Sequence, residues 1–145
     1  MKRKLNCVLL IDDDEPTNFL NTMLIEEARC SEYIQVKQSG QDALNYLTNC
    51  EDGEPGNKNF PCPDLIFLDI NMPAMNGWEF LAKYNELEKK HRGDCIIVML
   101  TTSLDPEDEA KAGKMKSVTA FRHKPLTKKI VDEILDTYFG CSVPK

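Results

Sequence analysis

Residues 64–73 read Asp64-Leu65-Ile66-Phe67-Leu68-Asp69-Ile70-Asn71-Met72-Pro73, an apolar run that stops at a carboxylate. Four consecutive apolar residues without a polar face predict a strand that is buried on both sides, as in a parallel sheet. Met72-Pro73 and Asn76-Gly77 then break the chain before the next helix. Asp69 is therefore expected at the carboxyl end of a central strand, where open α/β sheets bind their ligands.

Four further segments have the composition of strands. Cys7–Ile11 and Cys95–Leu100 are unbroken apolar runs, which predicts two more central strands. Tyr33–Lys37 and Val118–Arg122 alternate between apolar and polar residues, which predicts half-exposed strands at the edges of the sheet.

Helical patterns separate these strands. Asp14 is expected to cap the first helix, where apolar residues recur at helical spacing at Phe19, Leu20, Met23, Leu24 and Ala28. The other helices are predicted at Gln41–Thr48, at Trp78–Leu87, from Asp105-Pro106 onward, and after a Thr127 cap. The helix from Asp105 is expected to be weak, because it has few apolar positions and contains Gly113.

The alternation of strands and helices predicts an α/β fold with three layers, helices covering both faces of a five-stranded parallel sheet. With right-handed crossovers and the alternating strands at the edges, the expected strand order is 2-1-3-4-5. We expect a single domain over residues 1–145, with a core at about 5–139. An exposed loop insertion is predicted at about 49–63, and we assign it no function.

Composition limits the function. The formal net charge of -6 argues against nucleic acid or an anionic membrane as a partner. No apolar run approaches the ~18 residues of a membrane span. The six cysteines include no C-x-x-C pair, so we expect reduced thiols and a cytoplasmic protein, with a Cys50–Cys62 bridge as the alternative.

The predicted strand order brings polar groups from four strand ends to one edge of the sheet. They are Asp12 and Asp13, Asp69, Thr101 and Lys124. Neighbouring carboxylates repel one another unless some are protonated or a cation lies among them. Hard carboxylate oxygens at a water-accessible edge are suited to Mg²⁺.

This set of groups is suited to chemistry at phosphorus. Asp69 is the expected nucleophile, Lys124 and Mg²⁺ would stabilise charge on the phosphoryl oxygens, and the Thr101 hydroxyl would donate a hydrogen bond. The product would be an aspartyl phosphate. Nucleotide hydrolysis is not supported, because the sequence lacks the glycine-rich phosphate loop G-x-x-x-x-G-K-[ST].

Taken together, the motifs resemble the response-regulator receiver family over about residues 5–139. The resemblance is carried by Leu9–Asp14, Asp69–Pro73 with Gly77, Met99–Thr102 and Lys124-Pro125. It implies a flavodoxin-like fold and phosphoryl transfer to Asp69 from a phosphohistidine, on a histidine kinase or a phosphotransfer protein. Such a domain is mainly a signalling switch, although it catalyses its own phosphorylation and dephosphorylation.

The resemblance also implies roles for individual residues. Asp13, Asp69 and the backbone carbonyl of Asn71 would hold Mg²⁺ directly, and Asp12 largely through water. Thr101 and Lys124 would contact the phosphoryl group, and the Lys124–Pro125 bond would be cis.

The family's switch would couple Thr101 to the aromatic residue Phe121. The output face would consist of the helix from Asp105, the strand Val118–Arg122 and the helix after Thr127. It would bind a downstream protein, and homodimerisation is left open. Because no further domain is predicted after the last helix, we expect a stand-alone receiver.

Two alternatives remain. A haloacid-dehalogenase-type phosphatase would use Asp12 as nucleophile and Asp14 as acid, but Pro16 occupies a position where that class has Thr or Val, and Asp69 would have no role. A degenerate receiver would act only as a binding module.

Overall fold

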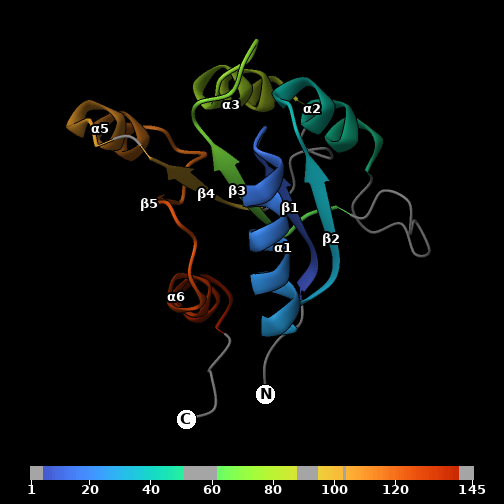
Figure 1. Ribbon diagram of the computed structural model, residues 1–145. Coiled ribbons are helices and arrows are strands. Elements are labelled where there is room, and N and C mark those ends of the chain that lie inside the picture. The colour runs from blue at the N-terminus through green and yellow to red at the C-terminus, as the bar shows by residue number, and fades with distance from the viewer. Residues whose placement is uncertain (1–4, 51–61, 88–94, 103, 141–145) are drawn as a thin grey trace.

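The computed structural model describes residues 5–50, 62–87, 95–102 and 104–140, in which strands and helices alternate (Figure 1). The strands are β1 (Leu5–Ile11), β2 (Ser31–Lys37), β3 (Leu65–Asp69), β4 (Ile96–Thr101) and β5 (Ala120–His123). The helices are α1 (Glu15–Ala28), α2 (Gly40–Asn49), α3 (Gly77–Glu86), α5 (Pro106–Lys114) and α6 (Lys128–Phe139). Residues 51–61, which make up most of the predicted loop insertion, lie outside the described residues.

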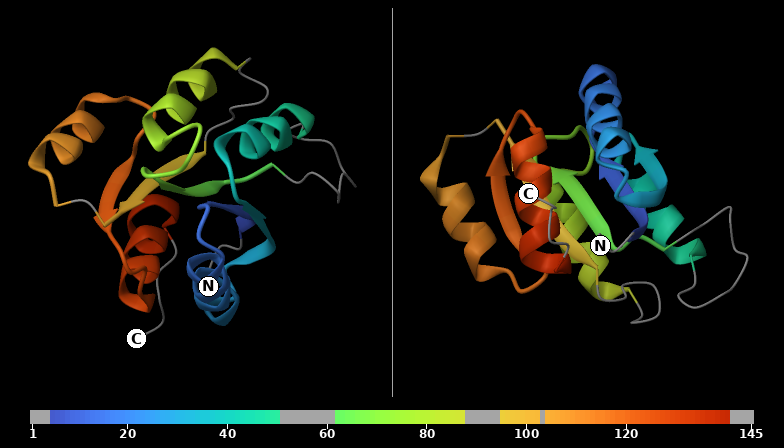
Figure 2. Two further views of the ribbon diagram at one scale, coloured as in Figure 1. Left: turned by 45° about the horizontal axis from the view of Figure 1, so that its top comes forward. Right: turned by 90° about the horizontal axis from the view of Figure 1, so that it is seen from below.

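All five strands are parallel and their order is β2-β1-β3-β4-β5, which confirms the predicted topology. Helices α2, α3 and α5 cover one face of the sheet, and α1 and α6 cover the other (Figure 2). The order reverses between β1 and β3, and the carboxyl ends of strands at such a reversal are where open α/β sheets bind their ligands.

The central and edge strands are as predicted. Every residue of β3 is buried, whereas β2 is half-exposed along most of its length. β5 begins two residues later than expected, at Ala120, because the Val118 amide donates to the Met115 carbonyl and closes a turn first. No disulfide joins Cys50 to Cys62.

The amphipathic pattern predicted for α1 is only partly correct, because Leu24 and Ala28 pack against the core but Phe19, Leu20 and Met23 are exposed. Phe19 and Leu20 are 65% and 59% exposed, and the buried face consists of Asn18, Asn21 and Ile25. The physical reason lies in the first turn of α1. The Asn18 side chain donates to the backbone carbonyl of Asp12 at 2.7 Å, and this contact turns the asparagines toward the sheet.

Two other expectations are confirmed. In α5 the buried face is reduced to Ala112, which agrees with the weak apolar pattern of that helix. The Lys124–Pro125 peptide bond is cis. Within the described part of the chain, each helix is too short or too polar to cross a bilayer.

Candidate functional site

Three carboxylates meet at the carboxyl ends of β1 and β3. Asp12 and Asp13 follow β1, Asp69 is the last residue of β3, and their oxygens lie within 4.8 Å of one another. Asp12 and Asp69 are buried, whereas Asp13 is exposed. The cluster therefore has a buried base and one side that is open to water.

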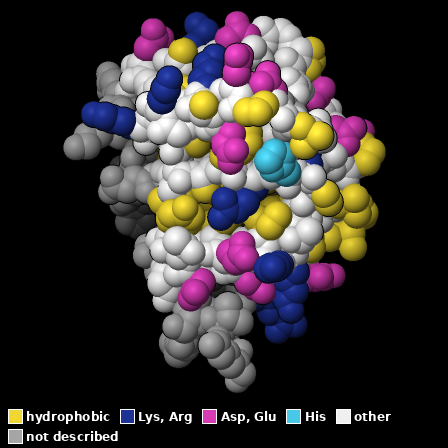
Figure 3. Space-filling model, turned by 90° about the vertical axis from the view of Figure 1, so that its left-hand side faces the viewer, with side chains coloured by type: hydrophobic (Ala, Val, Ile, Leu, Met, Phe, Trp, Pro, Cys, Tyr) yellow, Lys and Arg dark blue, Asp and Glu magenta, His cyan; other side chains and the backbone are white. Residues whose placement is uncertain are grey.

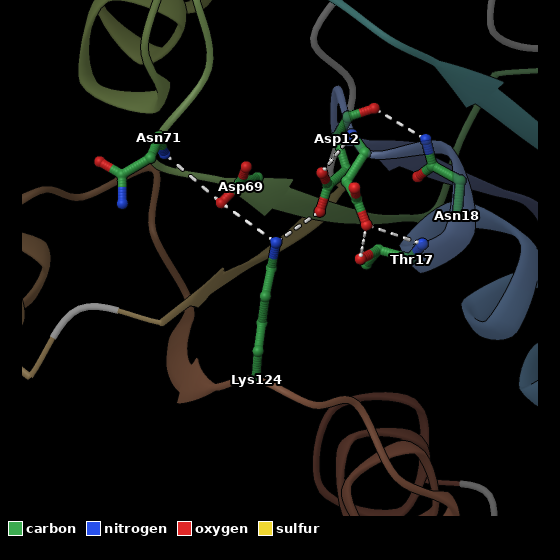
Figure 4. A network of polar contacts seen from close by, with 7 residues as sticks. Asp12, Thr17, Asn18, Asp69, Asn71 and Lys124 are labelled. Carbon is green, nitrogen blue, oxygen red and sulfur yellow. Dashed lines mark hydrogen bonds and ion pairs between the residues drawn. The ribbon is translucent and has the colours of Figure 1, made fainter.

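Lys124 reaches this cluster from the chain segment that follows β5. Its Nζ lies 2.6 Å from Oδ2 of Asp12 and 3.3 Å from Oδ1 of Asp69 (Figure 4). The lysine backbone is fixed as well, because its amide donates to the Thr101 carbonyl at 2.8 Å. One ammonium group thus bridges carboxylates from two different strands.

The electrostatics of the pocket leave an excess of negative charge. Burial and the charge of Asp12 raise the pKa of Asp69, and they outweigh the opposing effect of Lys124. Burial alone would lower the pKa of Lys124, but its hydrogen bond to Asp12 and the charges of Asp12 and Asp69 raise it overall. A pocket that makes a carboxylate harder to ionise despite a neighbouring ammonium group is favourable for a further cation.

The donor set fits Mg²⁺. It consists of hard carboxylate oxygens from Asp12, Asp13 and Asp69, and it contains neither a thiolate nor an imidazole. Because Asp13 is exposed, water has access to the same site, and Mg²⁺ usually retains several water ligands.

Asp14 has a structural task beside the cluster. It is the N-cap of α1, and its carboxylate accepts hydrogen bonds from the Thr17 backbone amide and hydroxyl. These bonds lower the pKa of Asp14. Its own amide donates to Oδ1 of Asp12 at 2.9 Å, so the turn after β1 orients Asp12.

The segment after Asp69 approaches the sheet closely. The Asn71 amide lies 3.4 Å from Oδ1 of Asp69, where it can donate a weak hydrogen bond. A Cβ atom on Gly77 would lie 2.7 Å from the Asp69 carbonyl oxygen, so the backbone can pass here only as glycine. The predicted role of the Asn71 carbonyl as a metal ligand stays a prediction.

Thr101 and Phe121 occupy neighbouring strands. Thr101 ends β4 and is fully buried, and it lies one residue beyond the pairing of Asp69 with Leu100. Phe121 in β5 is half-buried and lines a pocket of about 260 Å³ between α5 and β5. Both residues stand on strands next to the site, whereas their switching motion stays a prediction.

Sequence reasoning missed Asn18. This buried residue on α1 donates to the Asp12 backbone and lies beside the acidic cluster (Figure 4). The signal in the sequence was weak, because a polar residue in the first turns of a helix is usually solvated.

Comparison with known proteins gives a consistent result. A family model described as response regulator receiver domain matches residues 8–136. The two-component response regulator ARR22 of Arabidopsis thaliana is 30% identical over 139 residues, which cover 96% of this chain and 87% of that protein. Hybrid signal transduction histidine kinase L of Dictyostelium discoideum is 29% identical over 132 residues, and this chain spans 7% of its length.

The same similarity is found among solved structures. The crystal structure of a two-component response regulator from Cytophaga hutchinsonii matches with a TM-score of 0.80 and 36% sequence identity, covering 95% of this chain and 99% of that one. This match confirms the flavodoxin-like arrangement expected from the strand order. The matching family model gives no support to a phosphatase with Asp12 as nucleophile.

Proposed function

The chain belongs to the response regulator receiver family of two-component signalling, and we propose that Asp69 is its phosphoacceptor. The phosphoryl group would come from a phosphohistidine on a histidine kinase or phosphotransfer protein. The observation that carries this proposal is the position of Lys124, whose ammonium group contacts both Asp12 and Asp69 at the open edge of the sheet.

The transfer is a displacement at phosphorus. Oδ1 of Asp69 is engaged by Lys124 and by the Asn71 amide, so Oδ2 is the oxygen that attacks. A P–O bond forms as the P–N bond of the phosphohistidine breaks, and the bonding electrons pass to the imidazole nitrogen, which takes a proton. Lys124 is then close to the charge that builds up on the phosphoryl oxygens.

Asp12, Asp13 and Asp69 would hold Mg²⁺, with the backbone carbonyl of Asn71 as a further ligand. The ion would supply positive charge for the phosphoryl oxygens of donor and product. Asp69 contributes the nucleophile, and its side chain lies at the buried base of the cluster.

We propose that the response leaves the site through Thr101 and Phe121. New charge on Asp69 would attract the Thr101 hydroxyl, and Phe121 would turn into the space that is vacated. The affected surface is formed by α5, β5 and α6, where hydrophobic and charged side chains are mixed (Figure 3). A downstream protein would read this face.

One assay tests the proposal against its alternatives. The protein is incubated with acetyl phosphate, with and without Mg²⁺, and its intact mass is followed. We expect the mass of one phosphoryl group to be gained only with Mg²⁺, and Asp69→Asn to abolish the gain. Asp42→Asn, which changes an exposed carboxylate on α2, is the matched control and should be phosphorylated normally.

The alternatives give different results. A phosphatase would hydrolyse phosphate monoesters and lose that activity on Asp12→Asn. A binding module would gain no mass under any condition. Either result would contradict the proposed function.

A further inference from the structure

Asn18 is a buried asparagine in which only one of the two polar side-chain atoms has a hydrogen-bond partner. Its side-chain nitrogen donates to the Asp12 carbonyl at 2.7 Å, the residue is 4% exposed, and its Oδ1 has no hydrogen-bond partner (Figure 4). The amide orientation follows from this contact, because exchanging nitrogen and oxygen would set two acceptors against each other. The unpartnered oxygen is therefore a consequence of the bond to Asp12.

An unpartnered buried acceptor is unfavourable for folding. Asn18 lines a narrow hollow beside Asp12, Asn21 and Asp69 that has no room for a water molecule. An apolar side chain of similar volume would avoid the unsatisfied oxygen. The presence of asparagine at this position therefore has to be explained by its side-chain nitrogen, which donates to Asp12.

The bond acts on the peptide group that joins Asp12 to Asp13. This group is planar and rigid, and it runs from the Cα of one acid to the Cα of the next. Both side chains leave from its two ends, and both contribute oxygens to the cluster with Asp69. Fixing the rotation of this peptide therefore restricts the relative direction of the two Cα–Cβ bonds from which the carboxylates extend.

The other contacts of Asp12 act elsewhere. Its amide donates to the Lys37 carbonyl, which fixes the preceding peptide group. Its carboxylate accepts from the Asp14 amide and from Lys124. These bonds hold the side chain and the strand but not the carbonyl that Asn18 contacts.

We propose that Asn18 is a positioning residue of the divalent-cation site, and that it directs the Asp12 and Asp13 carboxylates toward Asp69 by fixing the peptide between them. The inference rests on the proposed function, because it concerns the same cation site. The cation site would thus depend on a residue of α1 in addition to its acidic residues.

The test measures Mg²⁺ affinity in the unphosphorylated full chain by isothermal titration calorimetry. Asn18→Leu removes the donor and the unpartnered oxygen together. Asn21→Leu is the matched control, because Asn21 lies one turn further on the same buried face and lines the same hollow. We expect Asn18→Leu to raise the Kd for Mg²⁺ about five- to tenfold, the equivalent of one lost hydrogen bond, while Asn21→Leu stays within about twofold.

A second measurement needs neither metal nor phosphorylation. In the Mg²⁺-free protein, we expect Asn18→Leu to lower the NMR order parameters of the Asp13 and Asp14 amides from roughly 0.85 toward 0.6, and Asn21→Leu to leave them unchanged. Denaturant unfolding of both variants checks that they remain folded, so that a change in these two amides can be assigned to a local effect. If Asn18→Leu does not fold, Asn18→Ala is measured in its place, because it removes the same donor without adding volume.

Three results would overturn the inference. The first is an unchanged Mg²⁺ affinity in the Asn18 variant, and the second is an equal loss in the Asn21 variant. Either would leave the proposed function intact, because phosphorylation of Asp69 is measured separately. The third is a wild-type chain that binds no Mg²⁺, which would remove the cation site from the proposed function as well.

Discussion

The ammonium of Lys124 lies 2.6 Å from a carboxylate oxygen of Asp12, although 112 positions separate the two residues in the chain. The carboxylate of Asp69 is further from the same ammonium, at 3.3 Å. Lys124 therefore balances the buried negative charge mainly through Asp12. This arrangement leaves Asp69 as the less fully neutralised of the two acids, in accordance with its raised pKa.

Removing the ammonium should destabilise the Mg²⁺-free protein. Lys124→Met leaves two buried carboxylates without their shared cation, and we expect a loss of about 1–2 kcal/mol in the free energy of unfolding, because the lysine is in part exposed. Urea denaturation in EDTA measures this. Lys128→Met, at an exposed position of α6, should change stability by less than about 0.5 kcal/mol. Equal effects in the two variants would contradict the ion-pair assignment.

Mg²⁺ should stabilise the folded chain. A ligand that binds only the folded state adds about 2.7 kcal/mol at one hundred times its Kd. We expect the Tm to rise with Mg²⁺ concentration, and Asp13→Asn to abolish most of that rise, since Asp13 is the exposed carboxylate of the cluster. Thermal melts at a series of Mg²⁺ concentrations and in EDTA measure this rise. The control variant Asp42→Asn should show the full rise in Tm.

The raised pKa of Asp69 gives a pH dependence with a definite sign. The folded state binds a proton at Asp69 more tightly than the unfolded state does, so ionised Asp69 destabilises the fold at neutral pH. Asp69→Asn should therefore raise the Tm of the Mg²⁺-free protein at pH 7, by roughly a few degrees. The difference should shrink as the pH falls toward the ordinary pKa of aspartate. A variant that melts below the wild type at pH 7 would refute this.

The two faces of α1 should respond oppositely to truncation. Leu20→Ala removes an exposed side chain and should change stability by less than about 0.5 kcal/mol. Ile25→Ala removes a fully buried one and should cost about 2–4 kcal/mol. Denaturant titration measures the free energy of unfolding of both variants. A larger loss for Leu20→Ala than for Ile25→Ala would mean that the side of the helix that carries Leu20 packs against the sheet.

Replacing Ala74 with glycine should stabilise the folded protein. It follows Pro73 with a φ of 66°, in the left-handed region that favours glycine, and Met75 donates back across it to the Pro73 carbonyl. We expect Ala74→Gly to raise the free energy of unfolding by about 0.5–1 kcal/mol. Ala82→Gly, at an exposed position inside α3, should instead lower it by about 1 kcal/mol. Opposite signs for the pair are the result to look for.

The sheet was predictable because its central strands carry no polar face. Cys7–Ile11 and Leu65–Leu68 have no side that could be solvated, and this fixes them as central and determines the strand order. The convergence of Asp12, Asp13, Asp69 and Lys124 then follows from topology, because parallel strands end at the same edge.

The orientation of α1 was only partly predictable from its pattern, which includes Leu24 and Ala28 of the core-facing side together with three exposed residues. Phe19, Leu20 and Met23 recur at the spacing of a buried face, but the helix is turned by a side-chain contact to Asp12. A hydrogen bond between an asparagine and the backbone of a preceding turn leaves no periodic trace in sequence. For the same reason Asn18 was missed as a residue of the site.

We propose that one carboxylate, that of Asp69, receives the phosphoryl group. After incubation with acetyl phosphate and Mg²⁺, reduction with borohydride converts an aspartyl phosphate to homoserine, and peptide mass spectrometry locates the converted residue. We expect homoserine at position 69 and unaltered aspartate at positions 12 and 13. Conversion at position 12, or no conversion in a chain that binds Mg²⁺, would contradict it.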